Sequence, residues 1–479
     1  MNNHSLTVLI CLLLLDCRGK PELTTGSEAA LRNYKEGVQL WSQFYYTEAR
    51  VQFDSSLTAD SGFAMGWARL AVLNLDTRDE HAARQNIERA LHLSINASEL
   101  EQLYIRYWNR QIRFLGEGAA AVVDSIITLY PEEAEAHVMR GGLYERGAML
   151  DSAIAHYREA VKLDSGYARA VMLLGYAYST AGEEEKAIDQ MQRYIRLAPD
   201  LADPRASYAD LLLRVGRYDE ALDQYDRSLE LKPDYWYSIS QIGFIYSILG
   251  RLRDAEKQFE LGMALLPQNP QLEADRVAVV AGLDMQRGNY ARALEQYSKA
   301  LALDSVNFDA SFGLVLALAK LGRFDEAAPV IKRIQLEIER RHLTESPVMV
   351  GYHMMRGRVL LDERRLDQAR GECLEALDRA QPIARAPVFR LLAEISLKER
   401  NFDQALNEVE EALSVNPNST SALLTLTRIY HADGERRMTQ EIGGRLLEFW
   451  KSADDDFKDL AELKGLLGSS PAVSFSSKP

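Results

Sequence analysis

Residues 168–201 read ARAVMLLGYAYSTAGEEEKAIDQMQRYIRLAPDL, and this stretch of 34 residues decides the fold. Val171, Leu174 and Tyr178 recur every three to four residues, a spacing that predicts one apolar face of a helix. Gly182 predicts the end of that helix, because glycine takes the left-handed conformation at a helix C-terminus without a Cβ penalty. The first half of the stretch is therefore expected to be one short helix.

The second half of the stretch repeats this spacing. Ala187, Met191 and Tyr194 predict the apolar face of a second helix, which ends at Pro199 because proline has no N–H group. Helices this short are marginal in isolation, so the two apolar faces are expected to pack against each other. The small residues Gly175 and Ala187 allow the two backbones to approach closely.

This pair of helices resembles one tetratricopeptide repeat (TPR). That family places a bulky residue, Leu-Gly, Tyr, Ala, an aromatic residue and Pro at fixed offsets. The offsets are filled here by Val171, Leu174, Gly175, Tyr178, Ala187, Met191 and Pro199. The resemblance implies an all-α, right-handed superhelical solenoid whose stacked helix pairs bind proteins or peptides.

The same period recurs along most of the chain. With the alanine-rich second helix as register, seven of the eleven steps between units are 34 residues long. The units begin near Ala30, Ala64, Leu100, Ala134, Ala168, Ala202, Trp236, Ala274, Phe308, Val350, Ala386 and Thr420. The alanine of the helix approach recurs as Ala49, Ala83, Ala119, Ala153, Ala187, Ala221, Ala255, Ala293, Ala327, Ala369 and Ala405. We therefore expect about twelve helix-turn-helix repeats over residues 30–453, with a possible seam near 338–349.

The N-terminus carries an apolar run followed by a cysteine. Residues 6–15, LTVLICLLLL, are too few to cross a bilayer and are typical of a signal peptide. The LLDC motif at residues 14–17 resembles a bacterial lipobox, in which the cysteine is lipidated. We expect residues 1–17 to be a signal segment with lipid on Cys17, and residues 18–29 to be a polar tether.

These features predict an exported, membrane-anchored lipoprotein of the periplasm or the outer membrane. Three alternatives remain open: a different signal or anchor, a wrong start codon, and an apolar run without a targeting role. The alternative localisation is the cytoplasm.

The C-terminal segment has its own pattern. Residues 454–467 read DDDFKDLAELKGLL, in which aspartates favour a helix start and Phe457, Leu460 and Leu463 share one face. A solenoid needs such a helix to cover its last apolar face, so this segment is expected to be a cap. Residues 468–479 are expected to be a disordered tail.

Composition and motifs exclude several classes of function. The 479 residues are 47% apolar with a net charge of −14, and an acidic chain repels phosphate backbones, so no nucleic-acid partner is expected. The three cysteines and eight histidines show no disulfide framework and no zinc spacing. Phosphate-binding glycine loops, HExxH and Gly-x-Ser-x-Gly are all missing from the sequence. We expect no catalytic residue, no metal and no cofactor, and hence no enzyme.

Cys373 has a structural interpretation. It occupies the offset that carries a large aromatic residue in other units, namely Phe53, Tyr157, Tyr225, Phe259 and Tyr297. We therefore expect it to be a small buried hydrophobic residue and not a reactive thiol.

The remaining candidate site is the inner surface of the solenoid. In the TPR family, offsets 2, 5, 9 and 12 of each first helix line this groove, and the resemblance places aromatic residues there. The candidate groove residues are Tyr34, Trp41, Trp108, Tyr176, Tyr237 and Phe244. Exposed aromatic side chains anchor peptides, but packing between neighbouring helices is the alternative for each of them.

Two further features of the groove bear on its partner. The family's clamp for acidic chaperone C-termini needs Lys and Asn at set offsets, and Val38, Val72 and Tyr176 stand there instead, so that partner is disfavoured. The last three units carry Arg358, Arg390, Glu394 and Arg428 in place of aromatic residues.

The sequence therefore predicts a non-catalytic scaffold that binds a protein or peptide and reaches the membrane through its lipid anchor. The alternative is a cytosolic regulatory or sensory array. That alternative rests on Trp67, ASELEQLYIRYW (97–108) and LYPEE (129–133), which resemble the TPR arrays of some bacterial kinases and adenylate cyclases.

Overall fold

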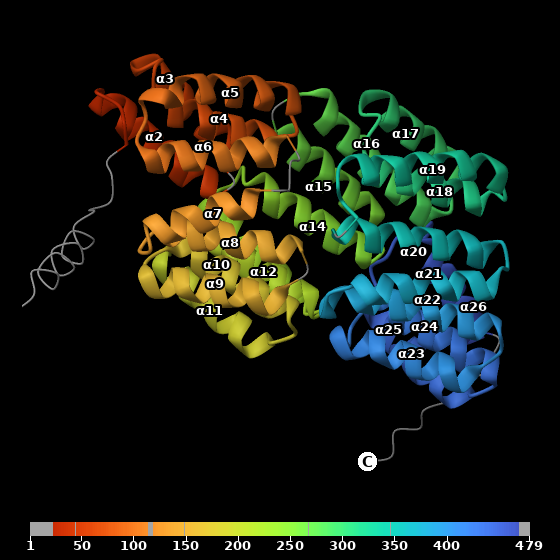
Figure 1. Cartoon of the computed structure of the whole chain (residues 1–479). Helices are drawn as coiled ribbons and strands as arrows, with labels where there is room; N and C mark the ends of the chain where they lie inside the picture. Colours follow the sequence, from red (N-terminus) through yellow and green to blue (C-terminus); the bar gives the residue numbers. More distant parts are fainter. Residues whose placement is uncertain are drawn as a thin grey trace, which may run out of the picture. The chain divides into compact units, whose positions relative to one another are not determined.

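The computed structural model describes residues 23–43, 45–113, 118–147, 149–266, 268–344 and 346–468. These residues form helices α2–α26 and two short 3-10 helices, with no strand among them (Figure 1). The predicted all-α solenoid of helix pairs is confirmed. The predicted signal segment with Cys17 and the predicted tail beyond Gly468 lie outside the described residues.

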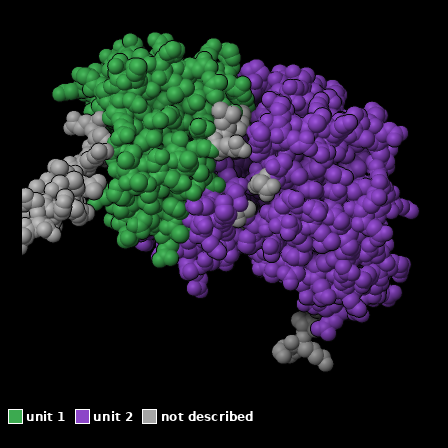
Figure 2. Space-filling view, viewed as in Figure 1, with its two compact units in different colours: residues 1–143, 155–170 green, residues 144–154, 171–479 purple. Residues whose placement is uncertain are grey.

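The chain divides into two compact units. Unit 1 consists of residues 1–143 and 155–170, and unit 2 of residues 144–154 and 171–479 (Figure 2). The division passes through α8, α9 and α10. The predicted seam at 338–349 falls inside unit 2, at the connection between α19 and α20.

Unit 1 is built from the first helices of the chain. They are α2 (Glu28–Ser42), α3 (Tyr46–Ala59), α4 (Ala64–Asp76), α5 (Glu80–Leu93), η1 (Ser94–Asn96), α6 (Glu99–Ile112) and α7 (Ala119–Leu129). The helices through which the division passes are α8 (Ala134–Arg146), α9 (Leu150–Leu163) and α10 (Ala168–Thr180).

Unit 2 contains the remaining helices. They are α11 (Glu184–Leu197), α12 (Ala202–Arg214), α13 (Tyr218–Leu231), α14 (Trp236–Ile248), α15 (Leu252–Ala264), α16 (Pro270–Arg287), α17 (Tyr290–Leu303), α18 (Phe308–Lys320), α19 (Phe324–Arg340), α20 (Pro347–Asp362), α21 (Leu366–Arg379), η2 (Pro382–Ala384), α22 (Arg385–Lys398), α23 (Phe402–Val415), α24 (Thr420–Asp433), α25 (Arg436–Phe449) and α26 (Lys458–Gly468).

The alanine register of the repeats is confirmed. Each of the eleven alanines in the second helices is at most 1% exposed, and Thr439 takes the same buried position in the twelfth unit. Small side chains are needed there because the two helices of a pair lie in close contact. At Gly37 on α2, a Cβ atom would lie only 2.7 Å from Cδ1 of Phe53 on α3, the paired helix.

The predicted tether is not a free linker along its whole length. Thr24 donates its backbone N–H to Oε1 of Glu101 at 2.9 Å, and Thr25 donates its hydroxyl to Asp60. Helix α2 already begins at Glu28, with Ser27 as its N-cap. Residues 24–29 are therefore part of the folded array of unit 1.

Unit 2 closes on itself through its C-terminal helices. Trp450 donates from Nε1 to the carbonyl of Ile248 at 3.1 Å, and the two residues are 202 positions apart. The backbone N–H of Asp454 donates to the carbonyl of Gly250 at 2.9 Å. A shared apolar core joins α15 and α16 to the C-terminal helices and includes Leu252, Phe259, Leu283, Trp450, Phe457, Leu460 and Leu463.

The segment that was expected to cap the solenoid takes part in this closure. Helix α26 packs on α24 and α25 and also contacts α16. The last helix therefore covers apolar surface on two distant parts of unit 2, and not only on the last repeat.

Candidate partner-binding site

Three of the candidate groove residues surround a buried arginine in unit 1. Arg69 on α4 is 4% exposed, and its Cζ lies 4.3 Å from the ring centroid of Trp108 and 5.3 Å from that of Trp41. The hydroxyl of Tyr34 accepts a hydrogen bond from Nε of Arg69 at 3.3 Å. Tyr34 and Trp108 are themselves only 5% and 6% exposed, so both rings belong to the core of unit 1.

Charged side chains also interact with the residues of this cluster. Arg69 forms an ion pair with Glu135 at 2.8 Å. Burial disfavours the charged guanidinium, but Glu135 outweighs it and the pKa of Arg69 is raised above its usual range. Trp41 donates from Nε1 to Asp76 at 2.6 Å and carries the Arg169 guanidinium 4.4 Å above its ring. These aromatic rings are thus engaged by the chain's own cations.

A second cluster gathers around a buried carboxylate in unit 2. Asp210 on α12 accepts hydrogen bonds from the hydroxyls of Tyr176, Tyr225 and Tyr237. Burial raises the pKa of Asp210, although the three tyrosine donors favour its ionised form. The Cζ of Arg214 lies 5.6 Å from the ring centroid of Tyr176. Tyr176 and Tyr237 are therefore partly engaged in holding one carboxylate.

Phe244 differs from the other five aromatic candidates. It lies on α14, is 48% exposed and lines a cavity of about 480 Å³. The cavity is lined by Asp210, Leu213, Arg214, Tyr218, Tyr237, Gln241, Phe244, Ile248, Asn416, Ser419, Thr420 and Ser421. Its walls come from α12, α14 and the start of α24, which the closure of unit 2 brings together.

The six candidates therefore fall into two clusters, one in each unit. Tyr34, Trp41 and Trp108 cluster in unit 1, whereas Tyr176, Tyr237 and Phe244 lie near Asp210 in unit 2. The sequence prediction missed Asp210, Arg214 and the wall formed by residues 416–421. The repeat register indicates which position of its helix Asp210 occupies. No local sequence pattern, however, indicates that residues 416–421 face α12 and α14.

The charged residues of the last repeats are paired within unit 2. Arg358 and Arg390 both form ion pairs with Glu394, and Arg428 binds Glu462 through two hydrogen bonds of 2.7 and 2.8 Å. Burial opposes ionisation of Glu394, but the arginines dominate and lower its pKa to about 2. These charged residues therefore already form ion pairs with other charged residues of unit 2.

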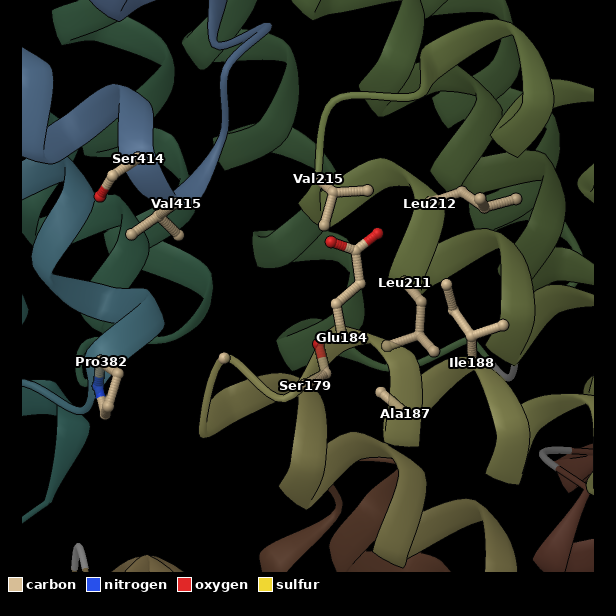
Figure 3. Close-up of a pocket in the computed structure, with 11 residues that line it drawn as sticks. Ser179, Glu184, Ala187, Ile188, Leu211, Leu212, Val215, Pro382, Ser414 and Val415 are labelled. Atoms are coloured by element: carbon tan, nitrogen blue, oxygen red, sulfur yellow. The ribbon is translucent and has the colours of Figure 1, made fainter.

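A smaller cavity of about 190 Å³ lies elsewhere in unit 2 (Figure 3). Pro382 and Val415 face Glu184 and Val215 across it, and Ala187, Ile188 and Leu211 lie on the same side as Glu184. The lining is mainly aliphatic and carries one carboxylate, so it selects no particular class of ligand.

Reactive side chains are sparse in the described part of the chain. Cys373 is fully buried as expected, and burial raises its pKa to about 12. His137 and His156 lie with their Nδ1 atoms 3.1 Å apart. Among the described residues no group of three metal-ligating side chains comes together. None of the described helices is both long and apolar enough to cross a membrane.

Comparisons with known families and structures identify the repeats. A model of the tetratricopeptide repeat matches residues 116–168, 148–202 and 283–340, and a second model of that repeat matches residues 203–235. A search of curated proteins found no match.

Several solved structures are similar to the chain. TTC0263, a thermophilic TPR protein of Thermus thermophilus, is 26% identical over 36% of this chain and 92% of that chain, with a TM-score of 0.31. MamA is 24% identical over 33% of this chain and 93% of that chain, with a TM-score of 0.28. The human IFIT1 dimer with m7Gppp-AAAA is 14% identical over 95% of this chain and 96% of that chain, with a TM-score of 0.41.

Proposed function

Because this chain belongs to the tetratricopeptide repeat family, we propose that it is a protein- or peptide-binding scaffold whose docking site is the cavity around Phe244. TPR repeats generally mediate protein–protein interactions, and TPR proteins are generally non-catalytic. The observation that carries the proposal is the 48% exposure of an aromatic ring inside a cavity of about 480 Å³. Ligand pockets fall in this size range.

We choose this cavity because the other candidate residues are buried or already have interaction partners within the chain. Tyr34 and Trp108 are buried, and Trp41 carries the Arg169 guanidinium. Tyr176 and Tyr237 donate their hydroxyls to Asp210. Phe244 is left as the aromatic side chain whose burial by a partner gains the most apolar contact, and such residues dominate binding free energies.

The experiment compares two exposed apolar residues of unit 2. A partner is captured with the wild-type protein, and its dissociation constant is then measured for Phe244→Ala and for the control Leu261→Ala, whose leucine is 53% exposed on α15. We expect Phe244→Ala to weaken binding about tenfold or more, and the control to leave it unchanged. Equal affinities for both variants and the wild type contradict this docking site.

We also propose that Cys17 carries lipid and holds the scaffold at a membrane after export. The support is the apolar run and the lipobox-like motif in the sequence. Expression in a bacterium with labelled fatty acid should give a labelled protein in the membrane fraction, and Cys17→Ser should lose the label. An unlabelled protein in the cytoplasmic fraction contradicts the proposal and favours the cytosolic regulatory array.

A further inference from the structure

The first described residues of unit 1 are held against the turns at one edge of its repeats. Thr24 donates its backbone N–H to Glu101 at 2.9 Å, and its hydroxyl oxygen accepts the backbone N–H of Ser98 at 3.1 Å. Thr25 donates its hydroxyl to Asp60 at 2.5 Å. The chain therefore enters unit 1 at this edge. We call it the N-terminal edge, and it comprises residues 23–27, the turn 60–63 and the loop 94–98.

The loop of the N-terminal edge carries an exposed apolar side chain. Ile95 lies in η1, three residues before Ser98, and is 79% exposed. No other large apolar residue in the described part of the chain is as exposed. Removal of this side chain from water is favourable, so the loop is suited to contact with an apolar phase.

An aromatic ring and a cation belong to the same edge. Trp67, in the first turn of α4, donates from Nε1 to the carbonyl of Ser61 at 3.0 Å. The guanidinium of Arg89 on α5 lies 4.2 Å from the centroid of the Trp67 ring. Tryptophan and arginine are typical of the boundary between water and a bilayer, because each combines an apolar body with a polar end.

The two carboxylates that hold this edge together are directed into the protein. Asp60 accepts the hydroxyl of Thr25 and the backbone N–H of Gly62, the latter at 2.9 Å. Glu101 is only 2% exposed. An anionic lipid surface attracts cations and repels carboxylates. The burial of these two groups therefore reduces the repulsion that a chain of net charge −14 would meet there.

An anchor at Cys17 would keep this edge close to the membrane. Leu23 follows Cys17 by six residues, and a fully extended chain of that length spans at most about 22 Å. Helix α4, with its 13 residues, is about 20 Å long, so the edge stays within about one helix length of the anchor. A short tether gives a high effective concentration, so a contact too weak to attach the free protein still forms.

We propose that the N-terminal edge of unit 1 faces the bilayer, with Ile95 buried at the boundary of the lipid head groups and acyl chains and Arg89 at the lipid phosphates. The proposal rests on the proposed lipidation of Cys17 and adds the face of the protein that meets the membrane. The contact requires the anchor, because one apolar side chain is too little for stable attachment.

The test places a fluorescent label at Ile95 and, as a control, at Val51, which is 58% exposed within α3 of the same unit. Ile95→Cys and Val51→Cys are expressed with the signal segment, labelled with nitrobenzoxadiazole and placed in vesicles of phosphatidylethanolamine and phosphatidylglycerol. Cleavage before Cys17 removes Cys11, lipid blocks the Cys17 thiol, and Cys373 is buried, so the label reaches only the new cysteine.

We expect the two labels to behave differently on vesicles. The emission of the label at position 95 should shift to shorter wavelength and be quenched by spin-labelled lipid, whereas the label at position 51 should show neither effect. The wild type provides a check without a label. Amides of residues 94–98 should exchange more slowly in the vesicle-bound protein than in soluble Cys17→Ser protein, whereas amides of residues 48–52 should not change.

Three results overturn the proposal. If the protein is lipidated and bound to vesicles but the labels at positions 95 and 51 behave alike, this inference is wrong and the anchor remains supported. If the protein carries no lipid, the anchor is wrong, and this inference is wrong with it. If the emission at position 95 shifts as protein concentration rises without vesicles, a second copy of the chain covers the loop in place of the bilayer.

Discussion

A single methyl group at Gly250 should loosen the closure of unit 2. Gly250 lies in the turn between α14 and α15 with a φ of +73°, against the C-terminal segment. In Gly250→Ala the new Cβ would lie 2.5 Å from Cδ1 of Phe457 and 2.7 Å from Cβ of Ala453. Carbon atoms prefer separations of about 3.5–4.0 Å, so the C-terminal segment must move.

Gly322 provides a matched control for the backbone effect. It occupies the equivalent turn between α18 and α19 with a φ of +72°, and a Cβ atom there would meet nothing within 4 Å. Both substitutions carry the cost of a left-handed alanine, roughly 1–2 kcal/mol, partly offset by a less flexible unfolded chain. Only Gly250→Ala adds overpacking, which costs about 1–3 kcal/mol.

We therefore expect Gly250→Ala to be less stable than Gly322→Ala by about 1–3 kcal/mol. Urea denaturation measures this difference, and hydrogen exchange locates it. Amides of residues 450–457 should exchange faster in Gly250→Ala, because the bond from Asp454 to the Gly250 carbonyl is strained or lost. Equal stability of the two variants with unchanged exchange at 450–457 would refute the closure of unit 2.

Three further predictions follow from buried groups and from the last helix. Burial raises the pKa of Asp203 to about 6, above its ordinary value near 3.9. The free energy of unfolding should therefore fall as pH rises from 4 to 7, because the buried carboxyl group loses its proton. Asp203→Asn should remove up to about 3 kcal/mol of this pH dependence, which urea denaturation of both proteins measures. Cys373 should resist iodoacetamide at pH 8 in the native protein and react only on unfolding, as mass spectrometry can follow; rapid native labelling would contradict its burial. Deletion of residues 454–479 should expose Leu252 and Leu283 and cause aggregation in light scattering, whereas a monodisperse, equally stable product would mean that this segment does not cover them.

The repeat architecture could be predicted because each helix pair is specified locally. Ala187 and the residues at its offset in other units are buried for the same reason, namely the close approach of two neighbouring helices. The turn at Gly182, with a φ of +78°, follows the same local logic. In a repeat protein each unit mainly contacts its neighbours, so a periodic pattern carries most of the information about the fold.

The closure of unit 2 could not be read from any such pattern. Trp450 meets the carbonyl of Ile248 across 202 residues, and the contact depends on small rotations summed over many repeats. Phe457 is periodic with the helix that follows it, which predicts an apolar face but not the surface that the face covers. The apolar pattern of residues 454–467 therefore predicts a capping helix, but it does not indicate the contacts with α15 and α16.

The candidate site shows the same limit at the level of side chains. The register offsets select residues such as Tyr34 and Phe244 without distinguishing between them. Their polar partners decide the difference: Arg69 engages Tyr34, whereas no residue of the described chain forms a ring contact or cation contact with Phe244. A pattern of offsets gives the direction of a side chain, but not what already occupies the space in front of it.

Docking at the Phe244 cavity is the central claim, and site-specific photocrosslinking in the native host tests it most directly. A benzophenone amino acid replaces Phe244 in one variant and the exposed Leu261 in a second, and crosslinked partners are identified by mass spectrometry. We predict one specific partner, crosslinked from position 244 and not from position 261. No crosslink at position 244, or the same partner in equal yield from position 261, would contradict a docking site in this cavity.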